Sequence, residues 1–143
     1  MITSKNIKLA QTEEGCRLQT YKDTLGVPTI GWGHALKPNE SYPNGITQVQ
    51  ADAFLLADLE VAYKDALKLV PSLDNLDDVR KAVIIDMSYN MGLSRFAGFH
   101  NFFAAIKDKD FIRAAHEMKN SRWYGQHVNR SQPLYIMMIT GEW

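Results

Sequence analysis

Residues 13–36 read "EEGCRLQTYKDTLGVPTIGWGHAL" and change from helical to extended character within a few positions. Glu13 and Glu14 come directly before a glycine, and Asp23 opens the turn sequence "DTLG". The alternating residues on either side of this turn predict a β-hairpin, and "TIGWGHAL" predicts a third short strand. The stretch therefore joins a helix end, a hairpin turn and a returning strand, with acids at the first two of these points.

A short helix is predicted before this stretch, over residues 3–14. Thr3 or Ser4 can cap its N-terminus, and Gly15 can end it. After the stretch, "KPNESYPNG" contains two prolines and an Asn-Gly pair without hydrophobic periodicity, which predicts a loop. The hairpin and this loop together predict a small β-hairpin lobe over about residues 13–46.

Helical patterns occupy the remainder of the chain. "TQVQ" fits a capping box with Thr47 as the N-cap, and the helix that it opens is expected to connect two lobes over about residues 47–70. Asn75 is expected to cap the next helix, "LDDVRKAVIIDMSYNMG", which is apolar over much of its circumference. The predicted fold class is therefore α+β, mostly α. Its larger helical lobe covers about residues 71–143, and the helix of residues 3–14 is expected to pack on that lobe.

Length and composition exclude several classes of protein. The 143 residues suffice for one domain with a sizeable core, and no apolar run approaches the roughly 20 residues that span a bilayer. The chain carries 16 basic and 16 acidic residues, so its net charge gives no attraction to nucleic acid. Cys16, the single cysteine, cannot form an internal disulfide, and the N-terminus lacks the apolar segment of a signal peptide. We expect a cytoplasmic monomer without nucleic-acid partner, membrane insertion, metal or organic cofactor.

Three residues of the opening stretch can act together chemically. Glu14 falls at the C-terminal end of the first helix, where exposed carbonyl groups disfavour a carboxylate, so its presence points to function. Taken singly, Asp23 is a common turn residue and Thr29 a common strand residue. Brought to one rim, a donor acid, a second carboxylate and a hydroxyl can cleave a glycosidic bond with water. Gly31 and Gly33 would allow a flat ligand to approach the backbone closely.

These residues resemble the signature of a known family. The order Glu-Gly, Tyr-x-Asp and Gly-x-x-Thr-Ile-Gly-x-Gly-His is similar to that of the phage-type lysozymes. "LDDVRKAVIIDMSYNMG", "AGFHNF", "AAHEMKNSRWYGQHVNR" and "TGEW" follow in the same order, so the resemblance covers nearly the whole chain. It implies a lysozyme-like fold and a muramidase that hydrolyses the β-1,4 bond between N-acetylmuramic acid and N-acetylglucosamine in peptidoglycan. "LKPNESYPNG" replaces a longer segment of the family, a departure that concerns the shape of the hairpin lobe and its grip on the substrate.

The resemblance implies the catalytic roles residue by residue. Glu14 matches the family's general acid, which protonates the leaving oxygen, and Asp23 matches the carboxylate that holds or activates the attacking water. Thr29 matches the hydroxyl that helps to place this water, and Arg130 matches an arginine that pairs with the catalytic glutamate. An inverting reaction is implied, for which the two carboxyl groups are expected to lie roughly 6.5–9.5 Å apart.

Further positions are carried over by the resemblance. Tyr89 and Asn90 match residues that face the sugar cleft, although core packing and a helix-end amide explain them equally well. Ala35 matches a cleft position where the backbone makes the contact. His34 matches a histidine that forms an ion pair with an aspartate of the long helix, here Asp58. We expect this structural pair to raise the pKa of His34 and to lower that of Asp58.

The resemblance also implies an endolysin, made in the bacterial cytoplasm and released through holes formed by a holin to act on peptidoglycan in host-cell lysis. Two alternatives are open. A lytic transglycosylase needs a catalytic glutamate but no second carboxylate, so Asp23 argues against it. A catalytically inactive peptidoglycan-binding module has no need of the set Glu14, Asp23 and Thr29.

Overall fold

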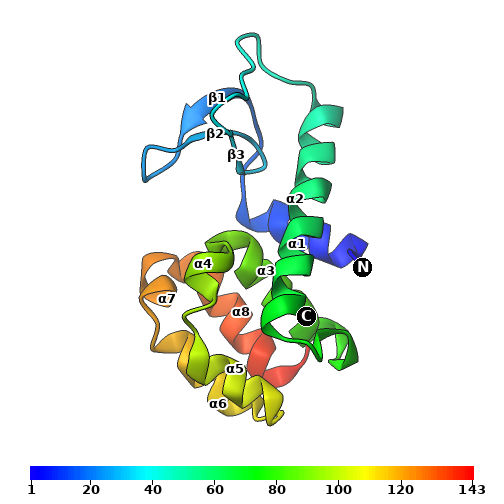
Figure 1. Ribbon diagram of the computed structural model, residues 1–143, viewed down its shortest axis with the longest axis vertical. Helices are drawn as coiled ribbons and strands as arrows, with labels where there is room; N and C mark the ends of the chain where they lie inside the picture. Colours follow the sequence, from blue (N-terminus) through cyan, green and yellow to red (C-terminus); the bar gives the residue numbers. More distant parts are fainter. The chain divides into compact units, whose positions relative to one another are not determined.

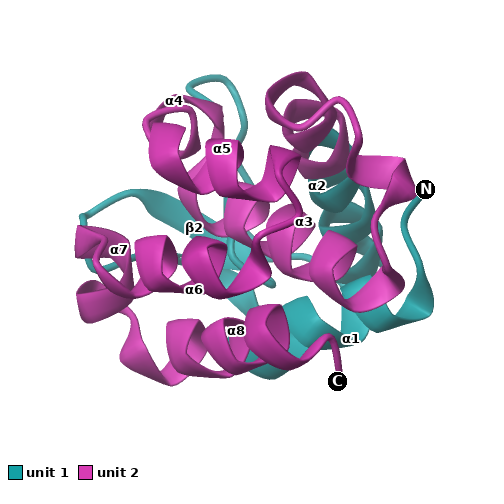
Figure 2. Ribbon diagram, turned by 90° about the horizontal axis from the view of Figure 1, so that it is seen from below, with its two compact units in different colours: residues 1–61 teal, residues 62–143 magenta.

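A computed structural model describes residues 1–143 as two compact units, Met1–Val61 (unit 1) and Ala62–Trp143 (unit 2), which Figure 2 distinguishes by colour. Helices dominate the chain, and three short strands form one antiparallel sheet (Figure 1), which confirms the predicted α+β, mostly α class. None of the helices has the length and the sustained apolar character that crossing a bilayer requires. The expected packing of residues 3–14 on the helical lobe stays a prediction.

Unit 1 begins with helix α1 (Ser4–Glu13), which opens on a capping box. The hydroxyl oxygen of Thr3 accepts a hydrogen bond from the backbone N–H of Asn6 (3.2 Å), and Asn6 Oδ1 accepts one from the backbone N–H of Thr3 (2.8 Å). The helix ends at Glu14, whose backbone is extended (φ −106°, ψ 131°) while its N–H still donates to the carbonyl of Ala10. The predicted N-cap and the predicted end of this helix are both confirmed.

The chain then forms a sheet in the order β1 (Arg17–Lys22), β2 (Pro28–Gly31) and β3 (His34–Ala35). Each strand pairs antiparallel with the next, as the hairpin and third-strand prediction requires. One face of the sheet supports a small apolar core of buried and partly buried residues. Its members are Ile30, Ile46 and Ala51, with Cys16, Trp32, Leu36, Tyr42 and Phe54 packed against them.

Helix α2 (Gln48–Leu69) begins at the predicted capping box. The backbone N–H of Gln50 donates to Thr47 Oγ1 (3.1 Å), and the backbone N–H of Thr47 donates to Gln50 Oε1 (2.8 Å). The helix ends one residue before the expected boundary at Val70. Its residues up to Val61 belong to unit 1 and the remainder to unit 2.

Unit 2 contains a 3₁₀ helix and six α-helices. The 3₁₀ helix η1 (Leu73–Asn75) precedes α3 (Asp78–Met91), and the N-cap of α3 is Asp77, whose carboxylate accepts from the backbone N–H of Arg80 (3.0 Å). The expectation that Asn75 caps this helix is wrong, because Asn75 is itself the last residue of η1. The remaining helices are α4 (Leu93–Phe96), α5 (His100–Lys107), α6 (Phe111–Lys119), α7 (Arg122–Gln126) and α8 (Val128–Thr140).

The core of unit 2 is built around α3, whose middle turns are almost entirely buried. Helix α3 packs against α4 and α8, and α6 packs against α5, α7 and α8. Four phenylalanine rings stack edge-on or tilted between α4 and α5, with centroids 5.0–6.3 Å apart: Phe96, Phe99, Phe102 and Phe103. Such ring pairs add about 0.5–1.5 kcal/mol each to the free energy that area burial provides.

Candidate active site

Glu14 is positioned by the end of α1. As the C-cap residue it points its side chain away from the helix where the chain turns toward β1, and it is half-buried. Its carboxyl group lies against Gly33 in the turn between β2 and β3, so that a methyl group at position 33 would come within 3.2 Å of Glu14 Cδ and Oε2. Gly33 also has a φ of +89°, a conformation that side chains disfavour. Position 33 therefore requires glycine for two independent reasons.

Gly31, at the end of β2, and Gly33, in the β2–β3 turn, both face side chains of the protein itself, and the expected close approach of a flat ligand stays a prediction. A methyl group at Gly31 would lie 3.4 Å from Cβ of Ala51 and 3.6 Å from Cδ1 of Ile46, within the core of unit 1. Gly33 makes room for the Glu14 carboxyl group in the same way. Both glycines accommodate the protein's own side chains, and Gly33 thereby becomes part of the surroundings of Glu14.

Asp23 follows β1 directly and organises the hairpin turn. Its Oδ1 accepts hydrogen bonds from the backbone N–H groups of Leu25 and Val27, both at 2.8 Å, and its own N–H donates to the carbonyl of Val27 (3.0 Å). Two backbone donors fix the rotamer of the carboxylate, while Oδ2 receives no hydrogen bond from the protein. The side chain thus combines the local turn role with a carboxylate oxygen that can accept from a ligand or a water.

Thr29 lies at the middle of the sheet and is 4% exposed. It pairs with Tyr21 of β1 on one side and with Ala35 of β3 on the other, and its hydroxyl donates to the carbonyl of Val27 (2.8 Å). Because this bond uses the only hydroxyl hydrogen, the oxygen of Thr29 acts toward any further partner as an acceptor. The exposed Ala35 sits directly across the ladder from this hydroxyl-bearing residue.

Tyr21 is the tyrosine of the Tyr-x-Asp signature, to which the sequence assigned no role of its own. Burial raises the pKa of its phenol, and the negative charges of Glu14 and Asp23 raise this pKa further, against the opposing guanidinium of Arg17. Arg17 Cζ lies 4.4 Å from the centre of the Tyr21 ring. Tyr21 is therefore exposed to the charges of both Glu14 and Asp23, and its backbone pairs with that of Thr29 in the sheet.

His34 begins β3 and is held between two carboxylates. Its Nδ1 lies 2.7 Å from Asp58 Oδ2 of α2, and its Nε2 lies 2.9 Å from Glu40 Oε2 in the loop that follows the sheet. Tyr42 donates its hydroxyl hydrogen to the same Glu40 oxygen (2.9 Å), and Phe54 stacks on the imidazole with centroids 4.7 Å apart. The contact with Asp58 is the one that the resemblance implies, whereas the contacts of Glu40 were not expected.

The pKa values of this group reflect the competition between burial and charge. Burial lowers the pKa of His34, but its hydrogen bonds to Asp58 and Glu40 outweigh burial and the net pKa is raised. The backbone N–H of Lys37 is the largest influence on Glu40, and together with His34 and Tyr42 it lowers the pKa of that carboxyl to about 2. Burial raises the pKa of Asp58 by more than His34 lowers it, so the expected lowering is wrong. Glu40 differs from Asp58 because it accepts hydrogen bonds from the N–H of Lys37 and the hydroxyl of Tyr42 in addition to its contact with His34.

Three of the predicted residues belong to unit 2. Asn90, near the end of α3, donates from Nδ2 to Asp86 Oδ2 one turn earlier (3.2 Å), while its Oδ1 is buried without a hydrogen-bond partner in the protein. Tyr89 is half-buried beside it. Arg130 lies in the first turn of α8 and is half-buried, with its backbone N–H bonded to the carbonyl of His127. The roles that the resemblance implies for these residues stay predictions.

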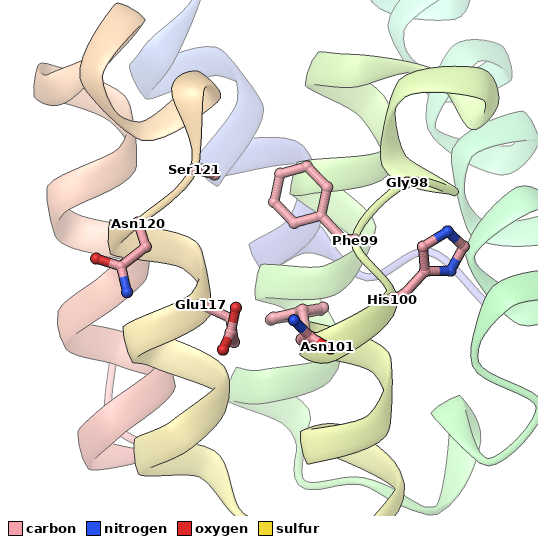
Figure 3. A pocket seen from close by; sticks show the side chains of 8 residues that line it. Gly98, Phe99, His100, Asn101, Glu117, Asn120 and Ser121 are labelled. Atoms are coloured by element: carbon pink, nitrogen blue, oxygen red, sulfur yellow. The ribbon is translucent and has the colours of Figure 1, made fainter.

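A cavity of about 370 Å³ opens between α5 and α6 in unit 2 (Figure 3), and none of the predicted site residues lines it. Phe99, Asn101 and Glu117 turn toward the space between the two helices, whereas His100 and Asn120 point away from it on opposite sides (Figure 3). Phe102 also lines the cavity but is only 1% exposed, so it belongs to the core. No three His, Cys, Asp or Glu side chains are grouped so as to hold a metal ion.

Known proteins match this chain along most of its length. The family described as phage lysozyme matches residues 11–134. Probable T4-type lysozyme 1 of Dictyostelium discoideum is 33% identical over 154 aligned residues, which cover 90% of each chain. The endolysin of Salmonella phage P22 is 36% identical over 102 residues, which cover 68% of this chain and 67% of its own. The chain therefore belongs to the phage lysozyme family of peptidoglycan-hydrolysing glycosidases.

Proposed function

We propose that this lysozyme hydrolyses the β-1,4 bond between N-acetylmuramic acid and N-acetylglucosamine with inversion at the anomeric carbon. The observation that supports the proposal is that two carboxyl groups flank the same small sheet: Glu14 lies against Gly33 in the turn between β2 and β3, and Asp23 follows β1 with Oδ2 left open to a ligand or a water. Inverting glycosidases use one such carboxyl group as the acid and the other as the base for water. The separation expected for this pair is roughly 6.5–9.5 Å, which leaves room for the water.

The proposed reaction assigns a separate task to each side chain. Glu14 gives its proton to the leaving glycosidic oxygen as the bond from that oxygen to the anomeric carbon breaks. A water attacks the same carbon from the opposite face, and Asp23 takes the proton that the water loses. Thr29 supports this step as a hydrogen-bond acceptor, because its own hydroxyl hydrogen is donated to Val27. With acceptors at Asp23 Oδ2 and Thr29 Oγ1, both hydrogens of the water point away from the sugar and a lone pair points toward it.

The substrate-binding residues follow the family pattern. Ala35 offers its backbone beside Thr29 at the edge of the sheet. Tyr89 offers an aromatic face and Asn90 an amide to the sugars, and the unpaired Oδ1 of Asn90 supports a role as acceptor for a sugar hydroxyl. Arg130 is proposed as the charge partner of Glu14. Truncation of the side chain of Tyr89 or Asn90 should therefore raise KM.

Glu14→Gln is the experiment that tests the catalytic proposal. We expect the parent to clear a suspension of purified peptidoglycan, and Glu14→Gln to clear it roughly 10²–10⁴-fold more slowly, because the variant has no proton to donate. Glu60→Gln is the matched control, since Glu60 lies on α2 outside the candidate site and should clear at the parental rate. Circular dichroism establishes that all three proteins are folded. Clearing by Glu14→Gln at the parental rate would remove Glu14 as the acid.

The stereochemistry and the role of Asp23 need a second measurement. Proton NMR of products formed in the first minutes should show the α-anomer, whereas a retaining enzyme would release the β-anomer. Asp23→Asn should also lose most of its activity, because an amide cannot take a proton from water. A parent protein that binds the wall and clears nothing would instead favour the inactive peptidoglycan-binding module.

The proposed biological role is host-cell lysis by an endolysin. We propose that the monomeric protein is made in the bacterial cytoplasm and reaches peptidoglycan only when a holin opens the membrane, without a nucleic-acid partner. A bacterial culture that produces the protein should therefore keep its turbidity until the membrane is permeabilised, and then lose it rapidly. Lysis without permeabilisation would contradict the need for a holin, and Glu14→Gln is the control that separates lysis from toxicity.

A further inference from the structure

The loop between β3 and α2 is tied to His34 through Glu40. Glu40 Oε2 lies 2.9 Å from His34 Nε2 and accepts the hydroxyl hydrogen of Tyr42, while Glu40 Oε1 accepts the backbone N–H of Lys37 (3.0 Å). Both carboxylate oxygens are therefore engaged, and the Glu40 side chain is only 19% exposed. Ordering a glutamate side chain costs about 1.5–2 kcal/mol of entropy, which these three hydrogen bonds offset.

The residue that Glu40 holds is the direct neighbour of Gly33. His34 is bound by Glu40 on one side and by Asp58 on the other. On the other flank of Gly33, the indole N–H of Trp32 donates to Asp52 Oδ1 of α2 (2.8 Å). Gly33 thus lies between two anchored residues, and its α-carbon faces the carboxyl group of Glu14. His34 is joined to Gly33 by one peptide bond, so a shift of His34 would move Gly33. Gly33 is the residue against which the Glu14 carboxyl group lies.

We propose that Glu40 is a positioning residue for the glycosidase reaction: by clamping His34 opposite Asp58, it keeps Gly33 against the carboxyl group of Glu14. This inference rests on the proposed function of Glu14 as the acid. Catalytic geometry is sensitive at this level, since a misplacement of about 1 Å can cost up to about 10²-fold in rate. Glu40 itself does not touch the substrate.

The clamp depends on the charge of His34. An imidazolium donates to Asp58 and Glu40 at once, whereas a neutral imidazole has one hydrogen for two carboxylates. The other groups that face this cluster are the phenol of Tyr42, which donates to Glu40, and the ammonium group of Lys37, which acts on Asp58. The aromatic ring of Phe54 covers the imidazole and carries no charge. Positioning should therefore weaken when His34 loses its proton.

Two substitutions of Glu40 separate its charge from its contacts. Glu40→Ala removes the clamp at every pH. Glu40→Gln keeps one acceptor for the N–H of Lys37 and presents an N–H to His34, so it satisfies a neutral imidazole but not an imidazolium. Glu60→Gln is the control for removing a carboxylate from unit 1 without touching His34. Initial rates of peptidoglycan clearing are measured against substrate concentration and pH, per folded molecule, and backbone NMR follows the amide of Gly33 together with the 13Cδ resonance of Glu14.

We expect Glu40→Ala to lower kcat roughly ten-fold while KM stays within about two-fold of the parent, because the acid is displaced and the sugar contacts are retained. The kcat of Glu40→Gln relative to the parent should be lowest while His34 is charged and should rise as His34 is deprotonated. The Gly33 amide and the Glu14 13Cδ resonance should move in both variants and stay unchanged in Glu60→Gln. A merely structural Glu40 would change the unfolding midpoint alone.

Two results would overturn the positioning role of Glu40. A parental kcat per folded molecule for Glu40→Ala across the pH range would overturn the positioning role, even if the variant unfolds more easily. Unmoved Gly33 and Glu14 resonances would overturn it as well, whatever the rates. Failure of the proposed function has a different signature: the parent itself would clear no peptidoglycan, or Glu14→Gln would clear it normally, while the NMR shifts would still report whether Glu40 holds Gly33.

Discussion

At the scale of the residue, the absence of a side chain at Gly33 leaves room for the Glu14 carboxyl group. Gly33→Ala should lower peptidoglycan clearing by at least about ten-fold per folded molecule, because the new methyl group would lie 3.2 Å from the Glu14 carboxyl and would force one of them to move. The positive φ of +89° adds a conformational cost of about 1–2 kcal/mol to the free energy of folding. Clearing rates and urea unfolding of the same sample separate the two effects.

Gly92→Ala is the control for the conformational part of this prediction. Gly92 also has a positive φ, of +77°, but a methyl group there would meet nothing within 4 Å. The variant should unfold more easily than the parent and keep the parental clearing rate per folded molecule. If Gly92→Ala and Gly33→Ala lost activity equally, the steric link between Gly33 and Glu14 would be wrong.

At the scale of the secondary-structure element, the N-cap residue Thr47 decides where helix α2 begins. Thr47→Ala should lower the free energy of unfolding by about 1 kcal/mol, because the N–H of Gln50 loses the hydroxyl acceptor that it has at 3.1 Å. Val49→Ala, in the same first turn, is the control: Val49 is 78% exposed and its truncation should change stability by less than about 0.5 kcal/mol. Chemical unfolding of both variants provides the comparison, and equal losses would refute the capping role.

Arg80 joins two elements of unit 2 that are far apart in the sequence. Its guanidinium donates to the carbonyls of Met138 and Ile139 at the end of α8 (2.8 and 2.9 Å) and stacks on the ring of Phe111 at 4.0 Å. Arg80→Met should therefore lower the free energy of unfolding by about 2 kcal/mol. Arg113→Met, which removes an exposed arginine 4.0 Å from Asp108, should cost less than about 1 kcal/mol. Similar losses for the two variants in thermal unfolding would contradict the assignment.

The elements that could be predicted from the sequence are those specified by local chemistry. The N-cap at Thr3, the capping box at Thr47 and the turn at Asp23 depend on residues within four positions of each other, and all three form as expected. Asn75 was expected to cap α3, but it ends a 3₁₀ turn that includes the buried Leu73, and Asp77 is the N-cap. Local sequence patterns identify residues that suit an N-cap position. They do not decide between two such residues that lie close together in the sequence.

The same distinction applies to the candidate site. The sequence identifies three catalytic candidates because they occur together in one recognisable motif: Glu14 at a helix end, Asp23 in a turn and Thr29 in a strand. The contribution of Glu40 depends on a loop closing onto His34, and that of Gly33 on the direction of the Glu14 side chain. Neither contact leaves a periodic or spacing signal in the sequence, because loop closure is set by the packing of Tyr42 and Phe54 in the unit 1 core. Residues that act through a neighbour therefore emerge only in the structure.

At the scale of the whole molecule, stability should depend on pH through specific groups more than through net charge. The chain has 16 basic and 16 acidic residues, so general charge repulsion is small near neutrality. Glu40, with a pKa lowered to about 2 from 4.5, stabilises the folded state above its ordinary pKa, and this contribution disappears as the pH falls toward 2. His34, with a raised pKa, stabilises below its ordinary value of 6.5, and this contribution disappears as the pH rises through the raised value.

These two contributions are present together only between about pH 4.5 and pH 6.5, where the free energy of unfolding should be greatest. Asp58 acts in the opposite sense, because its raised pKa lowers the free energy of unfolding as the pH rises above its ordinary value of 3.8. Urea unfolding of the parent and of His34→Gln between about pH 4 and pH 9 measures the effect. The parent should lose stability above about pH 6.5, whereas His34→Gln should lose much less. His116→Gln, which changes an exposed histidine on α6, is the control and should follow the parent. Parallel profiles for the parent and His34→Gln would mean that other groups control the alkaline limb, and the cluster around His34 would then be a packing feature without a titration of its own.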